Sequence, residues 1–199
     1  TQRPLYLTTD TVTTTAAITG SGALLTGTDL DLQIVKATAD VTNRWTTFVD
    51  TDGLPANDVR ALTFTPDGLK WFGAVDWQVS PSAGRAGVLD DGGTPFDKTD
   101  DTWQTFSEAD GLANYNVNAV AIQTISPTLA YKWFGVHYGG VSLLDDHGTP
   151  FNKVDDTWVT FTPADGLTSN RVYAIRIDAA GRKWFGTQGG GVSLLDDNG

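Results

Sequence analysis

Two acidic loops hold the side chains that are best suited to chemistry in this chain. Each loop surrounds a Gly-Thr-Pro-Phe segment and is rich in carboxylates. The first loop contains Asp90, Asp91, Asp97, Asp100 and Asp101, and the second contains Asp145, Asp146, Asn152, Asp155 and Asp156. Ca²⁺ takes about six to eight oxygen ligands, so both loops are candidate calcium sites. The same side chains could instead cap turns, with Phe96 and Phe151 packed against the protein.

Other catalytic chemistry finds little support, and we expect the chain not to be an enzyme. The chain has no cysteine that could act as a nucleophile. His137 and His147 lie in turn-like segments, and no serine elbow accompanies them. Two histidines are also too few for a zinc site without help from carboxylates. Hydrolysis by two carboxylates stays open as an alternative, because aspartate is abundant, but no pair is distinguished from the others.

Two further features could contact a ligand. A lysine begins each Lys-Trp-Phe-Gly motif, at Lys70, Lys132 and Lys183. These lysines could surround an anion, but we expect their stems to cover apolar surface while their ammonium groups reach water. Trp77 lies in a long loop that has no counterpart elsewhere in the chain. It either folds back over its sheet or is exposed as a contact for a sugar or a protein.

The elements that position these residues form an internal repeat of three motifs. Lys-Trp-Phe-Gly, Trp-x-Thr-Phe and Asp-Gly-Leu each occur three times, starting at residues 70, 132 and 183, at 45, 103 and 158, and at 52, 110 and 165. Periods of roughly 50–60 residues are typical of propeller blades or solenoid turns. Each unit reads as four short strands separated by turns, which predicts a four-stranded antiparallel blade.

A small residue recurs in the first strand of each unit. Ala61, Ala119 and Ala174 occupy equivalent positions in three successive repeats. We expect such a residue where the innermost strands of a propeller crowd around its axis. An ordinary strand alanine without this role is the alternative.

The recurring pieces NxVxAI, KWFGTxGGGVSLLDD, WxTF and DGL resemble the two-component regulator propeller repeat. That repeat is found in periplasmic sensor regions of hybrid histidine kinases and in secreted bacterial proteins. The resemblance covers roughly residues 43–199 and implies a β-propeller without an enzyme active site of its own. The chain departs from the family because it contains neither a membrane span nor a kinase segment, and because its repeats carry the inserted acidic loop.

We therefore predict an all-β protein that forms a single propeller domain of about four blades. The expected parts are a closing or exchanged strand (1–10), a degenerate first blade (11–48), a second blade (59–106), a third blade (117–161) and an incomplete fourth blade (172–199). Trp45–Phe48 would be the outer strand of the first blade. A threonine-rich stalk or linker is the alternative for the first 48 residues.

The fourth blade is expected to lack its outer strand, which leaves the third strand with an open edge. That edge consists of Val192, Ser193, Leu194 and Leu195. Open edges recruit strands, and a spare strand is predicted near the amino terminus at Leu5, Tyr6, Leu7 and Thr8. If this strand fills its own chain, a four-bladed ring closes. If it fills a neighbouring chain, a polymer forms by strand addition.

Charge and composition restrict the partners and the compartment. The net charge of −11 and the pI of about 4.3 argue against nucleic acid, which requires clustered lysine and arginine. An acidic surface suits divalent cations or a basic partner. The chain lacks cysteine and methionine, and its start suggests a mature chain from which a signal peptide has been removed. We expect an extracellular or periplasmic location and no membrane span.

The leading hypothesis is a non-enzymatic, secreted propeller that serves as a structural or adhesive surface component and forms homo-oligomers or filaments by strand addition. The alternative that the resemblance implies is the ligand-binding input module of a sensor, with a small molecule or glycan near the mouth of the ring. A third reading is a polysaccharide-active enzyme, which would need a cleft with two facing carboxylates.

Overall fold

The computed structural model describes residues 45–76 and 85–197, all within one compact unit. Among these residues the structure is all-β, with three short 3-10 helices and no α-helix. This confirms the predicted fold class at the level of antiparallel sheets. No described helix is long and apolar enough to cross a membrane.

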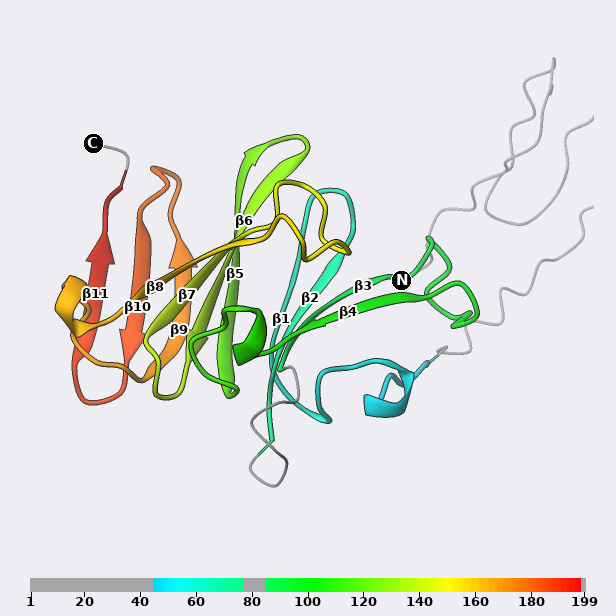
Figure 1. Ribbon diagram of the computed structural model, residues 1–199, viewed down its shortest axis with the longest axis horizontal. Helices are drawn as coiled ribbons and strands as arrows, with labels where there is room; N and C mark the ends of the chain where they lie inside the picture. The colour runs from blue at the N-terminus through cyan, green and yellow to red at the C-terminus, as the bar shows by residue number, and fades with distance from the viewer. Residues whose placement is uncertain (1–44, 77–84, 198–199) are drawn as a thin grey trace, which may run out of the picture. The chain divides into compact units, whose positions relative to one another are not determined.

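Three consecutive antiparallel sheets make up the described part of the chain (Figure 1). The first sheet contains β1 (Asp58–Phe64), β2 (Lys70–Val75), β3 (Ala86–Asp90) and β4 (Thr102–Phe106). The second contains β5 (Val117–Ser126), β6 (Leu129–Val136), β7 (Val141–Asp145) and β8 (Thr157–Phe161). The third contains β9 (Val172–Ile177), β10 (Lys183–Thr187) and β11 (Gly191–Leu195). In every sheet each strand pairs with its neighbour in sequence.

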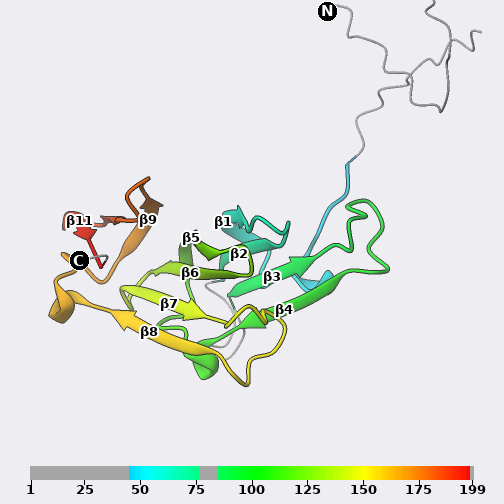
Figure 2. The same ribbon diagram turned by 90° about the horizontal axis from the view of Figure 1, so that it is seen from above.

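The sheets are arranged like successive blades. The first strands β1, β5 and β9 follow one another on one side, while β4 and β8 lie on the opposite side (Figure 2). β5 contacts both β1 and β2, and β9 contacts both β5 and β6. We call the side of a sheet that faces the preceding sheet its front face, and the other side its back face. The described residues form three such sheets without closing a ring.

The recurrent alanine has a packing explanation. Ala61, Ala119 and Ala174 pair with Gly73, Gly135 and Gly186 of the neighbouring strand. This pairing leaves a gap on the back face, and a valine from the next sheet enters it. Val117 Cγ1 lies 2.7 Å from where a Cβ on Gly73 would be, and Val172 Cγ1 lies 2.8 Å from that of Gly135. The small residues therefore make room for the neighbouring sheet.

The hydrophobic core lies between the sheets and is rich in aromatic rings. Trp71 of the first sheet meets Phe134 of the second at a centroid distance of 6.1 Å. Trp133 of the second sheet meets Phe185 of the third at 6.0 Å. Both tryptophans are completely buried. Because this tryptophan–phenylalanine contact recurs at both junctions, the three sheets pack on one another in the same way.

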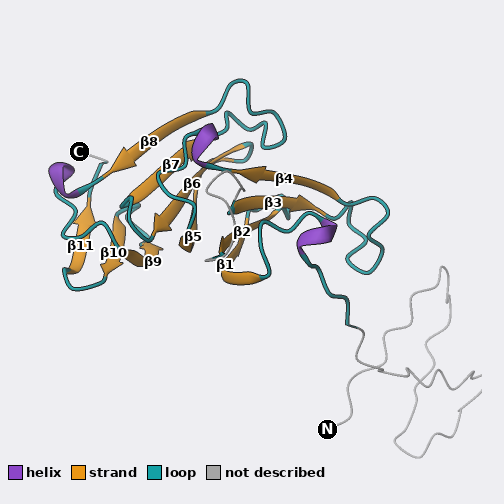
Figure 3. Ribbon diagram, turned by 60° about the horizontal axis from the view of Figure 1, so that its bottom comes forward, coloured by secondary structure: helices purple, strands orange, loops and turns teal. Residues whose placement is uncertain are grey.

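The Asp-Gly-Leu motifs form the predicted tight turns between sheets. They lie at the ends of the 3-10 helices η1 (Asp50–Asp52), η2 (Glu108–Asp110) and η3 (Pro163–Asp165), drawn in purple in Figure 3. In η2 the carboxylate of Asp110 accepts the backbone N–H of Ser107 at 2.7 Å. Gly111 then takes φ 121°, which glycine adopts without steric cost. Its missing Cβ also leaves room for the indole of Trp158.

Several predicted elements lie outside the described residues or differ from them. The predicted amino-terminal strand Leu5–Thr8, most of the degenerate blade and Trp77 fall outside the described ranges. The end of that blade, Trp45–Phe48, is described and is not a strand. Trp45 is 88% exposed, whereas Phe48 contacts the ring of Trp103 at 5.9 Å. The segment is thus attached to the first sheet by the ring of Phe48 and by a hydrogen bond from Lys98 to the carbonyl group of Thr47, and not by a ladder of backbone hydrogen bonds.

Candidate functional site

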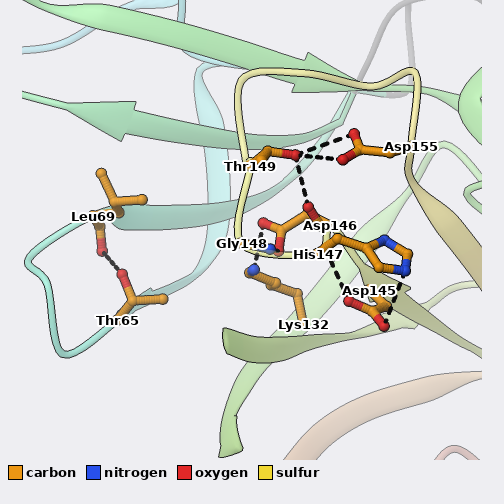
Figure 4. A network of polar contacts seen from close by, with 9 residues as sticks. All are labelled: Thr65, Leu69, Lys132, Asp145, Asp146, His147, Gly148, Thr149 and Asp155. Atoms are coloured by element: carbon orange, nitrogen blue, oxygen red, sulfur yellow. Dashed lines mark hydrogen bonds and ion pairs between the residues drawn. The ribbon is translucent and has the colours of Figure 1, made fainter. Parts of the chain in front are cut away.

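Several side chains of the two acidic loops accept hydrogen bonds from backbone or hydroxyl groups of the same loop. Asp90 accepts the backbone N–H of Gly92 at 3.0 Å, and Asp145 accepts that of His147 at 2.9 Å. The hydroxyl of Thr149 lies 3.1 and 2.9 Å from the two oxygens of Asp155, as Figure 4 shows. Thr94 makes the equivalent pair with Asp100 in the first loop. Asp97 and Asn152 accept backbone N–H groups two residues further on.

The second aspartate of each Asp-Asp pair is an ion-pair partner of the repeated lysine. Asp91 lies 2.6 Å from the ammonium group of Lys70, which holds the pKa of Asp91 below its usual value. Lys132 pairs in the same way with Asp146, whose side chain is completely buried (Figure 4). The pattern repeats between Lys183 and Asp197 in the third sheet.

The side chains of Lys132 and Lys183 are buried and that of Lys70 is partly buried, which corrects the expectation that their ammonium groups reach water. Lys132 Nζ lies 5.1 Å from the ring centroid of Trp71, and Lys183 Nζ lies 5.2 Å from that of Trp133. Lys132 and Lys183 therefore each contact a tryptophan face of the preceding sheet and a carboxylate of their own sheet. A cation–π contact and a countercharge together compensate for lost hydration. The lysines connect sheets and do not surround an anion.

A second lysine attaches each acidic loop to the turn that precedes its sheet. Lys98 reaches Asp52 at 2.7 Å, and Lys153 reaches Asp110 at 2.8 Å. The hydrogen bond from Lys98 holds the pKa of Asp52 below its usual value. Lys153 also lies 5.2 Å from the ring centroid of Phe106. The inserted loop is therefore fixed by an ion pair to the turn that precedes its sheet.

These contacts account for most of the residues predicted to bind calcium. No group of three or more acidic or histidine side chains that could hold a metal ion occurs among residues 45–76 and 85–197. The described geometry supports the turn-capping alternative, and calcium binding stays a prediction from composition. Phe151 packs against the core as that alternative expects, whereas Phe96 is largely exposed.

One carboxylate in each loop stands apart from this network. Both side-chain oxygens of Asp101 and one oxygen of Asp156 are buried and have no hydrogen-bond partner among the described residues. Burial raises the pKa of Asp156 to about 6, and the charges of Asp146 and Asp155 contribute in the same direction. Burial likewise raises the pKa of Asp101. At pH 7 the carboxyl group of Asp156 is therefore ionised, although its buried surroundings favour the protonated form.

We expect the Asp156→Asn variant to be more stable than the parent protein at pH 7, with a smaller advantage near pH 4. The folded-state pKa of Asp156 is above its unfolded value of 3.8, so the folded protein binds the extra proton. Stability consequently falls as the pH rises from about 4 to 6. Thermal unfolding across this range measures the slope, which the variant should flatten. The exposed Asp67→Asn serves as a charge-matched control, and an identical slope in both variants would contradict the assignment.

The open edge predicted in the fourth blade corresponds to β11. Among the described strands, β11 pairs with β10 alone. Val192 and Leu194 are exposed, whereas their equivalents in the second sheet, Val141 and Leu143, lie in the core or pack against it. Trp184 is 40% exposed, whereas the equivalent Trp71 and Trp133 are completely buried. The back face of the third sheet is thus apolar and uncovered by described residues.

A cluster of aromatic and cationic side chains joins the second and third sheets, and sequence reasoning missed it. The guanidinium group of Arg171 stacks 4.4 Å from the ring centroid of Tyr138 and donates a hydrogen bond to Gln188. His137 contacts the ring of Tyr138 and shares a hydrogen bond with Tyr173. Burial, assisted by the charge of Arg171, lowers the pKa of His137. These residues occupy positions of the repeat whose residue type does not recur, so only their proximity in space identifies them.

No family model matches the chain, and no curated protein matches it either. Among solved structures, the chain is similar to PorZ, an essential surface component of the type-IX secretion system of Porphyromonas gingivalis. That match has 21% identity and a TM-score of 0.55, covering 78% of this chain and 22% of PorZ. It shows a shared fold.

Two extracellular domains from B. thetaiotaomicron match more weakly. The domain of BT4673, a proposed one-component system, has 18% identity and a TM-score of 0.44, covering 70% of this chain and 16% of that chain. The domain of BT3049, a proposed hybrid two-component system, has 12% identity and a TM-score of 0.36, covering 77% and 24%. The chain spans less than a quarter of the length of each of the three matched chains.

Proposed function

We propose that this chain is a non-enzymatic part of an extracellular β-propeller protein with a structural or adhesive role, and that it self-associates by strand addition at β11. The observation that carries the proposal is that no described residue covers the edge and the back face of the third sheet, where Trp184 is 40% exposed. The PorZ likeness supports an extracellular setting, because that protein is a surface component. The buried contacts of Lys132 and Lys183 with tryptophans of the preceding sheet suit a scaffold.

The register of the complete sheets defines the strand that β11 would accept. In the first sheet Leu89 pairs with Trp103, and in the second sheet Leu144 pairs with Trp158. An added strand in this register would place its residues opposite Leu195 to Val192. The predicted strand Leu5–Thr8 is the proposed donor. Trp45–Phe48 is a competing donor, because it carries the Trp-x-Thr-Phe motif and belongs to no described sheet.

Deleting residues 1–9 is expected to reduce the assembly to the mass of a single chain, because β11 would lose its donor strand. Light scattering over a range of protein concentrations measures this mass. The Trp45→Ala variant tests the competing donor and should leave the mass unchanged, since Trp45 is exposed. An unchanged mass after the deletion would remove Leu5–Thr8 as the donor, and a loss of assembly only in Trp45→Ala would transfer that role to Trp45–Phe48.

The second candidate function is the input module of a sensor, and the cluster around Arg171 supports it. Among the described lysines and arginines, only Arg171 and Arg176 lack an ion-pair partner. A guanidinium group with neutral neighbours, next to the exposed ring of Tyr138, is suited to a small acidic ligand. A chain that stays monomeric at all concentrations would favour this function over self-association.

A further inference from the structure

We infer that the back face of the third sheet binds the front face of the first sheet of a second copy of this chain. This inference rests on the proposed self-association and adds a specific surface to it. Strand addition concerns the edge of β11, whereas this contact concerns the broad faces of two sheets. The argument follows from the two junctions that the chain already contains.

The first step is the space beside Gly186. At both internal junctions a valine of the following sheet fills the corresponding space, as Val117 does beside Gly73 and Val172 beside Gly135. Beside Gly186, the described atoms within 4 Å of an added Cβ all belong to Ala174 of the same sheet. The vacant space is an open hollow of about 480 Å³. Its lining includes Gly186 and Val192. It therefore corresponds to the spaces beside Gly73 and Gly135, but no described valine of a following sheet fills it.

The second step is the indole of Trp184. At the internal junctions the following sheet covers the equivalent tryptophan with a phenylalanine and a lysine, as Phe134 and Lys132 cover Trp71. Among the described residues no aromatic ring or cation covers Trp184 in this way, and it is 40% exposed. The occupant of this face should therefore present the same pair of side chains. In the first sheet, Phe72 and Lys70 hold the equivalent positions of the Lys-Trp-Phe-Gly motif.

The third step is the matching surface on the first sheet. Val59 occupies the position of Val117 and Val172, and it is exposed, as are Leu62 and Phe64 further along β1. Their counterparts in the second and third sheets are buried, as Val120 and Ile175 are, or partly buried, as Ile122 and Ile177 are. A soluble protein rarely leaves such apolar groups uncovered on one face. The front face of the first sheet thus carries the valine that the back face of the third sheet lacks.

Because these two faces differ, the copies would associate head to tail, with the third sheet of one copy against the first sheet of the next, and not through two identical faces. A second copy is the occupant that this complementarity favours, because the same pair of faces already packs twice within one chain. In this contact Val59 of one copy would enter the hollow beside Gly186 of the other. Lys70 would then approach Trp184, as Lys132 approaches Trp71.

Engineered cysteines test this contact directly, because the chain contains none of its own. The equivalent Val172 Cβ lies 3.2 Å from the Cβ position of Gly135, close to the separation of about 3.5–4.5 Å in disulfides. A tagged full-length Val59→Cys chain is mixed with an untagged Gly186→Cys chain under mild oxidation. We expect a mixed disulfide dimer as the main product, resolved by mass spectrometry. Mixing Val154→Cys with Gly186→Cys is the control, because Val154 is exposed in the acidic loop.

The outcomes separate this contact from strand addition. A mixed dimer at least tenfold more abundant than in the control supports the face-to-face contact. Equal yields in both mixtures overturn it. If the yields are equal while deletion of residues 1–9 still reduces the assembly to single chains, the result supports strand addition and contradicts the face-to-face contact. As a check that does not depend on cysteine chemistry, Val59→Asp should abolish association, and an unchanged mass in light scattering would also overturn the inference.

Discussion

Replacing Asp146 by alanine is expected to lower the free energy of unfolding by about 3–5 kcal/mol. The ammonium group of Lys132 lies between Asp146 and the indole face of Trp71, and both charged side chains are almost completely buried. Without the carboxylate, a buried positive charge would retain only its cation–π contact. Urea denaturation followed by circular dichroism measures the loss.

Two comparisons make this prediction specific. The Asp58→Ala variant removes an exposed ion pair with Arg60 and should cost at most about 1 kcal/mol. Replacing Lys132 by methionine together with Asp146→Ala should recover much of the stability, because no charge is then left unpaired. A cost below about 1 kcal/mol for Asp146→Ala alone would mean that water reaches Lys132, contrary to the structure.

Trp133→Ala is expected to cost about 3–5 kcal/mol of unfolding free energy. Its ring is completely buried, stacks on Phe161 at a centroid distance of 5.5 Å and carries Lys183 on its face. Truncation would open a cavity at the junction of two sheets and remove the support of a buried cation. Denaturant unfolding monitored by circular dichroism provides the measurement, since this signal does not depend on the deleted indole.

The matched control for Trp133 is its equivalent in the third sheet. Trp184 is 40% exposed, and its main specific contact is a hydrogen bond of 3.0 Å to Asp178. That bond helps to lower the pKa of Asp178 to about 2. We expect Trp184→Ala to cost less than about 2 kcal/mol, the scale of one hydrogen bond to a charged group. Equal costs for the two variants would show that the third sheet is covered in solution as the second is.

The strands could be predicted from the sequence because each sheet is built from neighbouring segments. β5 to β8, for example, pair only with strands that are adjacent along the chain. Their short runs of apolar and β-branched residues and their turn glycines are therefore visible within one repeat. The Asp-Gly-Leu turns were predictable for the same reason, since Asp110 caps a helix only three residues long.

The contacts between sheets could not be predicted in the same way. Lys132 belongs to one repeat and Trp71 to the one before it, and the two meet only when their sheets stack. Read within its own repeat, a lysine beside two aromatic residues indicates an exposed ammonium group. The tertiary structure buries it, because the tryptophan face and Asp146 together replace its hydration.

The acidic loops show the same division between local pattern and spatial arrangement. The sequence identified which oxygens could bind a cation, because that depends on residue type alone. The partners of these oxygens depend on the folded sheet, in which Lys70 and Lys132 form ion pairs with Asp91 and Asp146. The cluster around Arg171 had no sequence signal, since residues of three separate segments form it. A repeat encodes its own sheet, whereas the tryptophan that each buried lysine contacts in the preceding sheet is decided only when the sheets pack together.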